Sequence, residues 1–408
     1  MRLIFRREGG VPVFTKARRL SLLPILLMFA LAAAQAAEKP LRGVCYGPFR
    51  NGQSPETGVY PTRAQLREDL LFAQRAASAV RMYGNERTLK GIPVICADLG
   101  LACYPAAYLG GNDASDAEQV QRLIAIAARR DATTKGLIVG NESQLFGLVS
   151  QDKLVAYLRQ VRAATDIPVS TAEPWHVWKD RPALVAEVDY ILVHCHPFWE
   201  TPPVPVDQAA RFVADRVEEI RALYPGLPVV VGETGWPSSG PANGGAVPGE
   251  ANQEAFWLAF DSLAHSNSIS YFAFELFDEA WKGEGGVGAH WGLCSTARPA
   301  APKDALEALI RRRTIPAENA VLSAGKALSF WWWAPPPVAL SELRVQRYDA
   351  AAGRFKAHTS RLVTVTTQGF WKAPASAFPA GTYRWSVRNS IGGAWQPRSP
   401  WRTFTRED

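Results

Sequence analysis

A regular alternation of apolar runs and amphipathic stretches between Leu41 and Arg313 constrains the fold of this 408-residue chain most strongly. The apolar runs have the length of strands and lie at 42–47, 79–84, 101–109, 136–142, 167–173, 188–196, 227–234 and 269–277. The longer stretches place apolar residues three and four positions apart, as helices with one buried face do. They lie at 62–78, 116–130, 153–165, 207–224, 252–266 and 302–313.

Eight strand-then-helix units in about 270 residues match the number and size of a (β/α)8 TIM barrel. Continuous apolar strands fit a parallel sheet that helices cover on its outside, so the fold class is α/β. A doubly wound open sheet is the alternative. The first loop, YGPFRNGQ at 46–53, lacks the glycine fingerprint of a phosphate-binding turn, which disfavours that alternative.

The tail after Pro316 loses the helical period and alternates in the manner of strands, with Gly, Asn and Pro between them. This pattern predicts a small all-β sandwich at 316–408 as a separate accessory domain. GTYRWSVR at 381–388 and WRTFT at 401–405 resemble a fibronectin type III module. The tail tryptophans are expected mainly to fill the sandwich core or its seam with the barrel. Stacking on sugars is the alternative.

The first 36 residues have the layout of a secretory signal peptide. Lys16, Arg18 and Arg19 precede the apolar run 20–34, and Ala34-Gln35-Ala36 offers a small-x-small cleavage pattern. We therefore expect a secreted or periplasmic protein with a catalytic domain at 37–315 and no membrane contact after cleavage. An uncleaved anchor is the lesser alternative.

Charge and cysteine content narrow the class of protein further. The net charge of +7 includes +5 from residues 1–36, so the remainder carries about +2 (7 − 5). That excess is too small for a nucleic-acid footprint. The five cysteines have no metal-type spacing, and their odd number prevents complete pairing within one chain. Small buried thiols are the simplest interpretation, and one disulfide is the alternative.

Two glutamates at predicted strand ends are the candidate catalytic groups. In a TIM barrel the carboxyl ends of the strands surround the active site. Glu142 ends the fourth strand and Glu233 the seventh, so the two acids are expected to face each other across the mouth. Paired carboxylates among many aromatic side chains suggest glycoside hydrolysis, in which one acid protonates the leaving oxygen and the other attacks.

The segments GLIVGNE at 136–142, VVVGETGWPSSG at 229–240 and FELFDEAWKGEGG at 274–286 resemble glycoside hydrolase family 17, the β-1,3-glucanase family. The resemblance runs in matching order from GVCYG at 43–47 to HWGL at 290–293. It implies a retaining mechanism with Glu142 as acid/base and Glu233 as nucleophile. The residues that it assigns to substrate binding are Tyr46, Arg81, Tyr83, Asn141, His196, Trp236, Glu275, Glu279, Lys282 and Trp291.

One segment departs from the plant members of that family. Their N-x-Y-P-Y-F segment is replaced by HCHPFW at 194–199, so His196 stands where they have a tyrosine that assists the nucleophile. His194 and His196 share a strand face and could both ligate a metal, but no third ligand is evident from spacing. No metal or cofactor is therefore expected. Glu173 and Glu200 are expected to be solvated loop acids.

The activity that follows is hydrolysis of a β-1,3-glucan polysaccharide or oligosaccharide by a monomeric enzyme. An arginine beside Glu233 favours the ionised nucleophile, and a facing negative charge favours a protonated Glu142. Retention requires carboxyl groups roughly 5–5.5 Å apart. The alternatives are a β-1,3-glucanosyltransferase and a non-catalytic glucan-binding protein.

Overall fold

The computed structural model describes residues 39–314, 316–317, 319–324, 328–365 and 369–407, and the predicted signal peptide lies outside this part of the chain. Parallel strands form one sheet in the order β3-β2-β1-β9-β8-β7-β6-β5-β4. Their bounds are β1 Val44–Cys45, β2 Ala79–Arg81, β3 Ala102–Tyr104, β4 Ala106–Ala107, β5 Leu137–Asn141, β6 Val169–Pro174, β7 Ile191–His194, β8 Val229–Thr234 and β9 Ser270–Ala273.

The sheet closes on itself because its two end strands are one stretch of chain. Pro105 alone separates β3, which pairs with β2, from β4, which pairs with β5. The nine segments therefore occupy eight strand positions of a nearly closed barrel. The predicted TIM barrel is confirmed, and the doubly wound alternative is wrong.

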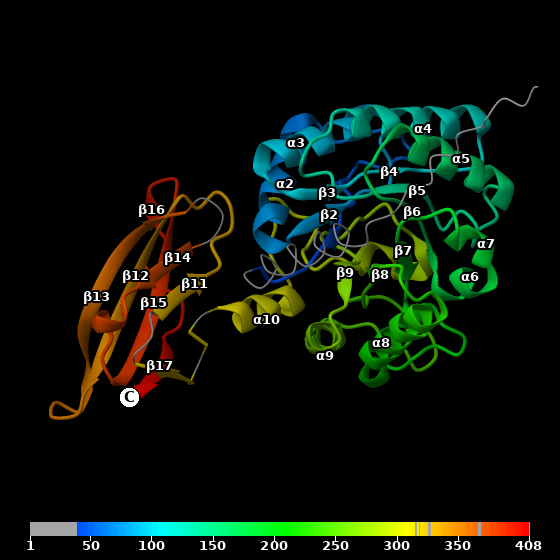
Figure 1. The fold of residues 1–408 in the computed structure, drawn as a ribbon. Coiled ribbons are helices and arrows are strands. Elements are labelled where there is room, and N and C mark those ends of the chain that lie inside the picture. The colour runs from blue at the N-terminus through cyan, green and yellow to red at the C-terminus, as the bar shows by residue number, and fades with distance from the viewer. Residues whose placement is uncertain (1–38, 315, 318, 325–327, 366–368, 408) are drawn as a thin grey trace, which may run out of the picture.

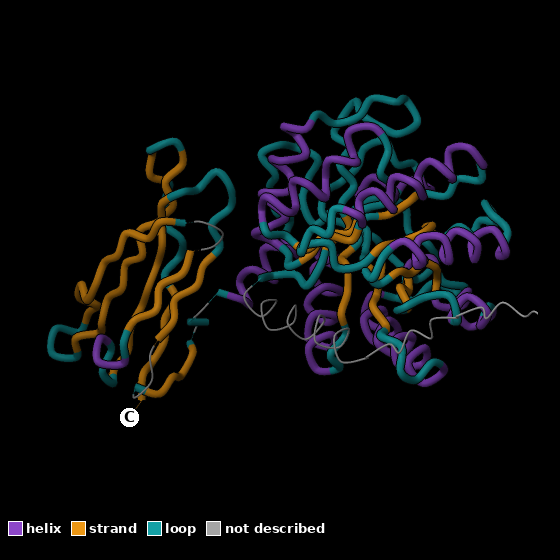
Figure 2. The backbone as a smooth tube through the Cα atoms, turned by 45° about the horizontal axis from the view of Figure 1, so that its top comes forward, coloured by secondary structure: helices purple, strands orange, loops and turns teal. Residues whose placement is uncertain are grey.

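Helices surround the barrel (Figures 1 and 2). They are α2 Arg63–Ala76, α3 Ile92–Leu99, α4 Asp113–Ala128, α5 Gln151–Ala164, α6 Trp175–Asp180, α7 Pro182–Val185, α8 Val206–Leu223, α9 Glu250–Ser266 and α10 Asp304–Arg313. Polar side chains cap the N-termini of three of these helices. Thr62 caps α2 in a capping box with Gln65, and Asn112 and Ser150 cap α4 and α5.

Three helices were not predicted from the sequence because they are short. The longest, α3, has Pro93 in its first turn and ends at Gly100 in a left-handed conformation, φ 64°. Eight residues show too few turns for a clear helical period. The other two, α6 and α7, follow each other after β6 and have six and four residues.

The tail forms a second domain of two sheets. The larger sheet has the order β10-β17-β15-β12-β13, with β16 added to β15, and the smaller pairs β11 with β14. Their bounds are β10 Ala320–Ser323, β11 Leu328–Trp332, β12 Leu340–Asp349, β13 Arg354–Thr364, β14 Gly369–Ala373, β15 Gly381–Ile391, β16 Ala394–Trp395 and β17 Arg402–Glu407. Phe330 and Trp332 from the small sheet share a buried core with Val345 and Trp385 from the large one. The tail is therefore a sandwich, and its likeness to fibronectin type III stays a prediction.

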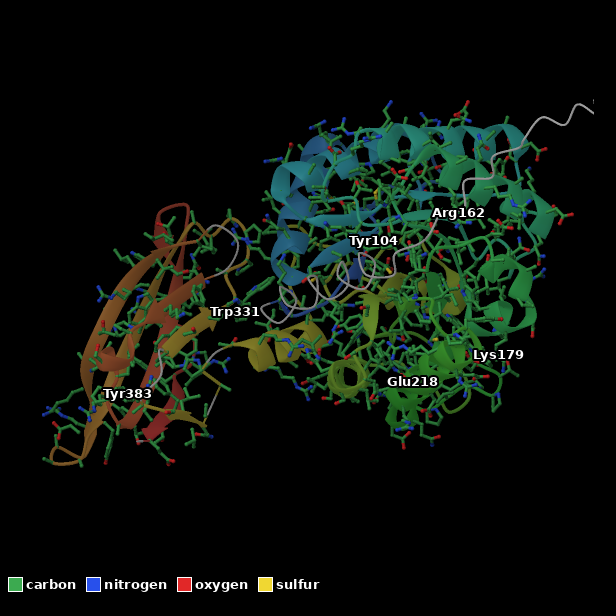
Figure 3. The ribbon with its side chains drawn as sticks, in the orientation of Figure 1. Tyr104, Arg162, Lys179, Glu218, Trp331 and Tyr383 are labelled. Carbon is green, nitrogen blue, oxygen red and sulfur yellow. The ribbon has the colours of Figure 1, made fainter. Side chains whose placement is uncertain are left out.

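The sandwich packs on the barrel beyond α10 (Figure 1). Arg75, at the end of α2, donates to the carbonyls of Ala334 and Val338, and the contact to Val338 measures 3.1 Å. The Trp333 ring lies 5.6 Å from that of Phe72. Trp331 lies on the side of the sandwich nearest the barrel (Figure 3) and is 3% exposed. Several tail tryptophans therefore serve the core and the seam, as expected.

The cysteines and the lengths of the helices bear on two further expectations. All five cysteines are buried and free, in agreement with the interpretation as small buried thiols. Among the described residues, every helix is too short or too polar to cross a membrane.

Candidate active site

A cleft of about 1120 Å³ opens at the mouth of the barrel, where the carboxyl ends of the strands meet. Its volume exceeds the roughly 300–1,000 Å³ of most small-molecule sites, so it can hold more than one sugar ring. Of the predicted site residues it is lined by Tyr46, Tyr83, Asn141, Glu142, His196, Glu233, Glu279 and Lys282.

Glu142 leaves the end of β5 through an irregular backbone. Gly140 has φ 83° and Glu142 itself has φ 51°, in the left-handed region that few non-glycine residues adopt. A register shift between Ile138 and Asn141 accompanies this turn. Backbone geometry of this kind costs roughly 1–3 kcal/mol and is retained mainly at functional sites. The left-handed backbone at Glu142 therefore lowers the stability of the fold and sets the direction of this carboxylate.

Glu173, on β6, anchors the loop that follows Glu142. Its carboxylate accepts the backbone N–H of Gln144 at 2.9 Å and of Leu145 at 3.2 Å, and the Ser143 hydroxyl at 3.3 Å. The residue is fully buried, and burial raises the pKa of Glu173 to about 7 despite these bonds. The expectation of a solvated loop acid was wrong, because Glu173 lies within β6 and is completely buried.

Glu233 lies among basic side chains at the end of β8. Arg81 Nη1 is 2.7 Å from Glu233 Oε1, and His196 Nε2 is 3.2 Å from Glu233 Oε2. Burial alone would raise the pKa of Glu233. The positive charge of Arg81 and the hydrogen bond from His196 outweigh that effect and hold the pKa well below its usual range. The site thus keeps Glu233 ionised, as the sequence analysis expected from Arg81.

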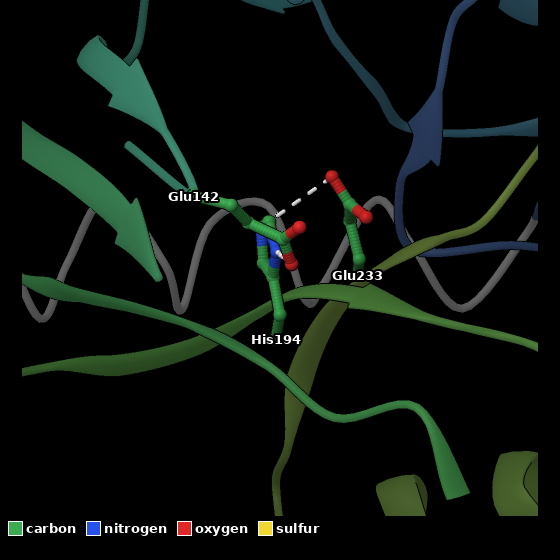
Figure 4. A group of neighbouring side chains, drawn as sticks. All are labelled: Glu142, His194 and Glu233. Carbon is green, nitrogen blue, oxygen red and sulfur yellow. Dashed lines mark hydrogen bonds and ion pairs between the residues drawn. The ribbon is translucent and has the colours of Figure 1, made fainter. Parts of the chain in front are cut away.

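His194 lies between the two acids (Figure 4). Its Nδ1 is 2.7 Å from Glu142 Oε1, and its Nε2 is 3.5 Å from Glu233 Oε1. One carboxylate oxygen of Glu142 and one of Glu233 lie within 4.8 Å of each other. The acids of strands β5 and β8 therefore face each other across a single imidazole ring.

These three side chains could in principle ligate a metal ion. However, Arg81 Nη1 contacts both Glu233 Oε1 and, at 3.0 Å, His194 Nε2. The guanidinium brings a fixed positive charge to the place that a cation would take. The donor set therefore fits an arginine-neutralised carboxylate better than a metal site.

A second ion cluster stands at the end of β9. Lys282 Nζ is 2.7 Å from an oxygen of Glu275 and 2.7 Å from Glu279 Oε2. Burial opposes the charge on Lys282, but the two carboxylates outweigh it and raise the pKa of Lys282. Burial raises the pKa of Glu275 well above its usual range. Glu275 lies behind the cleft and acts through Lys282, which lines it.

Two tyrosines and one asparagine complete the wall near the acids. The Tyr46 hydroxyl bonds Asp69 at 3.1 Å, and the Tyr83 ring stacks on the Arg81 guanidinium at 4.9 Å. Asn141 accepts a hydrogen bond from Arg81 Nη2 through its side-chain oxygen. That contact leaves the amide nitrogen of Asn141 as its group for a ligand in the cleft.

Trp236 and Trp291 do not reach the cleft, in contrast to the sequence-based expectation. Both are 0% exposed. The Trp236 indole donates to the Val247 carbonyl at 2.9 Å and stacks on Phe256. Trp291 packs 5.4 Å from the His196 ring. Their large apolar rings fill the layer beneath the site, and Trp291 holds His196 in place.

Other aromatic side chains line the cleft instead. Trp175, Trp199 and Trp281 do so. Tyr108 and Phe146 also line it and are 46% and 66% exposed. Sequence reasoning missed these two because a single aromatic residue in a loop carries no pattern.

A TIM barrel with facing carboxylates in an aromatic-lined cleft has the architecture of a glycoside hydrolase. The comparison with protein families agrees and is more specific. Residues 43–292, more than half of the chain, match the BtgE/BtgC glycoside hydrolase domain, and the chain belongs to that family. The chain therefore contains a BtgE/BtgC glycoside hydrolase domain.

Named relatives include two fungal proteins called probable beta-glucosidase btgE. The one from Aspergillus fumigatus is 28% identical over 263 residues, which are 62% of this chain and 45% of that protein. The one from Aspergillus oryzae is 30% identical over 259 residues, 61% of this chain and 41% of that protein. The chain thus spans less than half the length of these relatives.

Two solved structures share the barrel. A glycoside hydrolase family 17 β-1,3-glucanosyltransferase from Rhizomucor miehei aligns with TM-score 0.56 and 24% identity, over 64% of this chain and 96% of that one. An endo-laminarinase from Formosa Hel1_33_131 aligns with TM-score 0.56 and 18% identity, over 65% and 86%. At these identities the likeness shows the fold.

Proposed function

We propose that this protein is a retaining glycoside hydrolase that cleaves β-1,3-glucan by double displacement. Glu233 attacks the anomeric carbon and forms a glycosyl-enzyme, while Glu142 protonates the departing oxygen. Glu142 then removes a proton from the water that releases the sugar.

The observation that carries this proposal is the geometry of the acid pair. One oxygen of each acid lies within 4.8 Å of the other, which is close to the roughly 5–5.5 Å separation of retaining enzymes and short of the about 6.5–9.5 Å of inverting ones. The Arg81–Glu233 ion pair keeps one acid anionic, as a nucleophile must be. Such an arrangement also argues against a purely glucan-binding role.

The substrate class rests on the cleft and on the relatives together. The cleft holds more than one sugar ring, and its aromatic walls suit the flat apolar faces of glucose. An active-site mutant of the Rhizomucor miehei β-1,3-glucanosyltransferase was solved in complex with laminaritriose, and its structure covers 65% of this chain at 23% identity. We extend β-1,3-oligoglucoside binding to this chain on that basis.

Product analysis on laminari-oligosaccharides tests the proposal. We expect the wild-type protein to shorten laminaripentaose, and Glu233→Gln to reduce the rate roughly 1,000-fold or more. Glu250→Gln, on the exposed start of α9, is the matched control and should behave as wild type. Full activity of Glu233→Gln would disprove the nucleophile role.

A glucanosyltransferase is the second candidate, and one observation favours it. Leu145 and Phe146 lie three and four residues after Glu142, line the cleft and are 39% and 66% exposed. An apolar platform on the acid's side of the cleft can hold an acceptor sugar in place of water. Products longer than the starting oligosaccharide would identify transfer, and shorter ones alone would identify hydrolysis.

The proposal also includes export of the protein from the cytoplasm and the bounds of its two domains. We infer secretion or delivery to the periplasm from the N-terminal pattern, with the catalytic domain at 37–315 and the sandwich at 316–408. Mass measurement of the mature protein tests this inference, since cleavage after Ala36 would remove 36 residues.

A further inference from the structure

His194 is the side chain that the two proposed catalytic acids share. It ends β7, is 1% exposed, and lines the cleft. Its ring contacts Glu142 through Nδ1 at 2.7 Å and Arg81 through Nε2 at 3.0 Å. Through Arg81 the same ring is connected to Glu233.

The contact with Arg81 decides which ring nitrogen carries the hydrogen. A guanidinium has donors and no acceptor, so Nε2 must accept at 3.0 Å. The ring hydrogen then lies on Nδ1, since the tautomer of a histidine follows the bond made by its other nitrogen. His194 therefore donates from Nδ1 to Glu142 Oε1.

The backbone leaves room for this arrangement at one position. A Cβ on Gly232 would lie 2.9 Å from His194 Cδ2 and 2.7 Å from Leu192 Cγ. Real Cβ atoms do not approach so closely, so any larger residue at 232 would displace the ring. The glycine before the nucleophile thus clears space for His194.

We propose that His194 is the positioning residue of the acid/base. Its Nδ1–H holds Glu142 Oε1, which leaves Oε2 as the oxygen that delivers the proton to the glycosidic oxygen. Its Nε2 fixes the ring against the arginine that neutralises the nucleophile, so the two acids keep their spacing. This inference rests on the proposed function, in which Glu142 is the acid.

Two substitutions of His194 distinguish the contact that Nδ1 makes with Glu142 from the contact that Nε2 makes with Arg81. His194→Asn keeps an N–H donor at the distance from Cβ that Nδ1 has, so it can still hold Glu142. His194→Gln moves the donor one bond further, to the place of Nε2, and loses that hold. Both are measured on laminaritriose and on 2,4-dinitrophenyl β-laminaribioside, whose leaving group departs without a proton.

We expect His194→Gln to lower kcat/KM on laminaritriose by about 100-fold, within the range of general acid catalysis. On the dinitrophenyl substrate its kcat/KM should fall less than about threefold, because kcat/KM reports the first bond cleavage and that bond breaks without the acid. His194→Asn should stay within about tenfold of wild type on both substrates. His196→Asn, which contacts Glu233, is the matched control and should lose similar fractions on both.

Equal losses for His194→Gln on the two substrates, or equal losses for the Asn and Gln variants, would overturn the proposal. Unfolding temperatures verify that each variant folds. If His194→Gln does not fold, His194→Ala gives the same comparison of substrates. Failure of the proposed function itself is distinguishable, since Glu142→Gln would then hydrolyse laminaritriose as fast as wild type does.

Discussion

The buried carboxyl group of Glu173 shows how a single residue can support the site at an energetic cost. Burial raises its pKa from 4.5 to about 7, so the folded protein binds its proton more tightly than the unfolded chain does. The free energy of unfolding must therefore fall as pH rises from about 4.5 to about 7. Above that range the loss is complete.

Glu173→Gln removes this pH dependence, and its amide oxygen can still accept the Gln144 N–H, while the bond from the Leu145 N–H to the second oxygen is lost at every pH. Relative to wild type, its free energy of unfolding should rise by about 3 kcal/mol between pH 4.5 and pH 8, at about 1.4 kcal/mol per pKa unit. Urea unfolding at the two pH values measures this. Glu56→Gln, at an exposed acid, is the control, and parallel curves for Glu173→Gln and wild type would contradict the account.

At the residue scale, the sequence identified site residues that belong to a motif. It did not identify residues whose role depends on which strands lie next to each other in the fold. Glu142 and Glu233 follow from strand ends and motif order. The bridging place of His194 depends on strands β5, β7 and β8 meeting in space, which no local pattern encodes. Trp236 and Trp291 were misplaced because motif membership does not distinguish a sugar platform from the packing behind it.

At the scale of elements, irregular strand ends place the catalytic groups. Register shifts occur between Val193 and His194 and between Val231 and Thr234, where the strands reach the mouth. Such shifts turn side chains that a regular strand would send elsewhere. The sequence predicted the strands from their apolar runs, but these runs contain no signal for the irregularities.

Substitution at Gly232 tests this element-scale view. Gly232→Ala should reduce activity on laminari-oligosaccharides at least about tenfold and stability by about 1–3 kcal/mol, because the new methyl group collides with His194 and Leu192. Activity assays and thermal unfolding measure the two effects. Gly91→Ala is the matched control, since nothing lies within 4 Å of a Cβ there. Wild-type activity in Gly232→Ala would refute the packing argument.

At the scale of the whole molecule, the sandwich is joined to the barrel by contacts around the end of α2. Arg75 is 6% exposed and donates to two carbonyls of the segment between β11 and β12. The sequence predicted both domains from their different periodicities. It predicted tryptophans at the seam but not the Arg75 contact, because that contact joins residues about 260 positions apart and one partner is backbone.

Arg75→Ala should loosen this seam without changing either core. We expect faster cleavage between the two domains in limited proteolysis, and activity on short oligosaccharides close to wild type. Arg211→Ala, on the exposed face of α8, serves as the control. Identical cleavage rates for Arg75→Ala and wild type would mean that the other contacts alone hold the domains together.

In the proposed mechanism, Glu233 becomes covalently bound to the sugar in the first step. The most direct test of this step is mass spectrometry of the protein after reaction with a 2-deoxy-2-fluoro-laminaribiosyl fluoride, which slows release of the intermediate. We expect one added glycosyl group, on the peptide that contains Glu233. A label on another residue, or a first product of inverted anomeric configuration without any label, would contradict it.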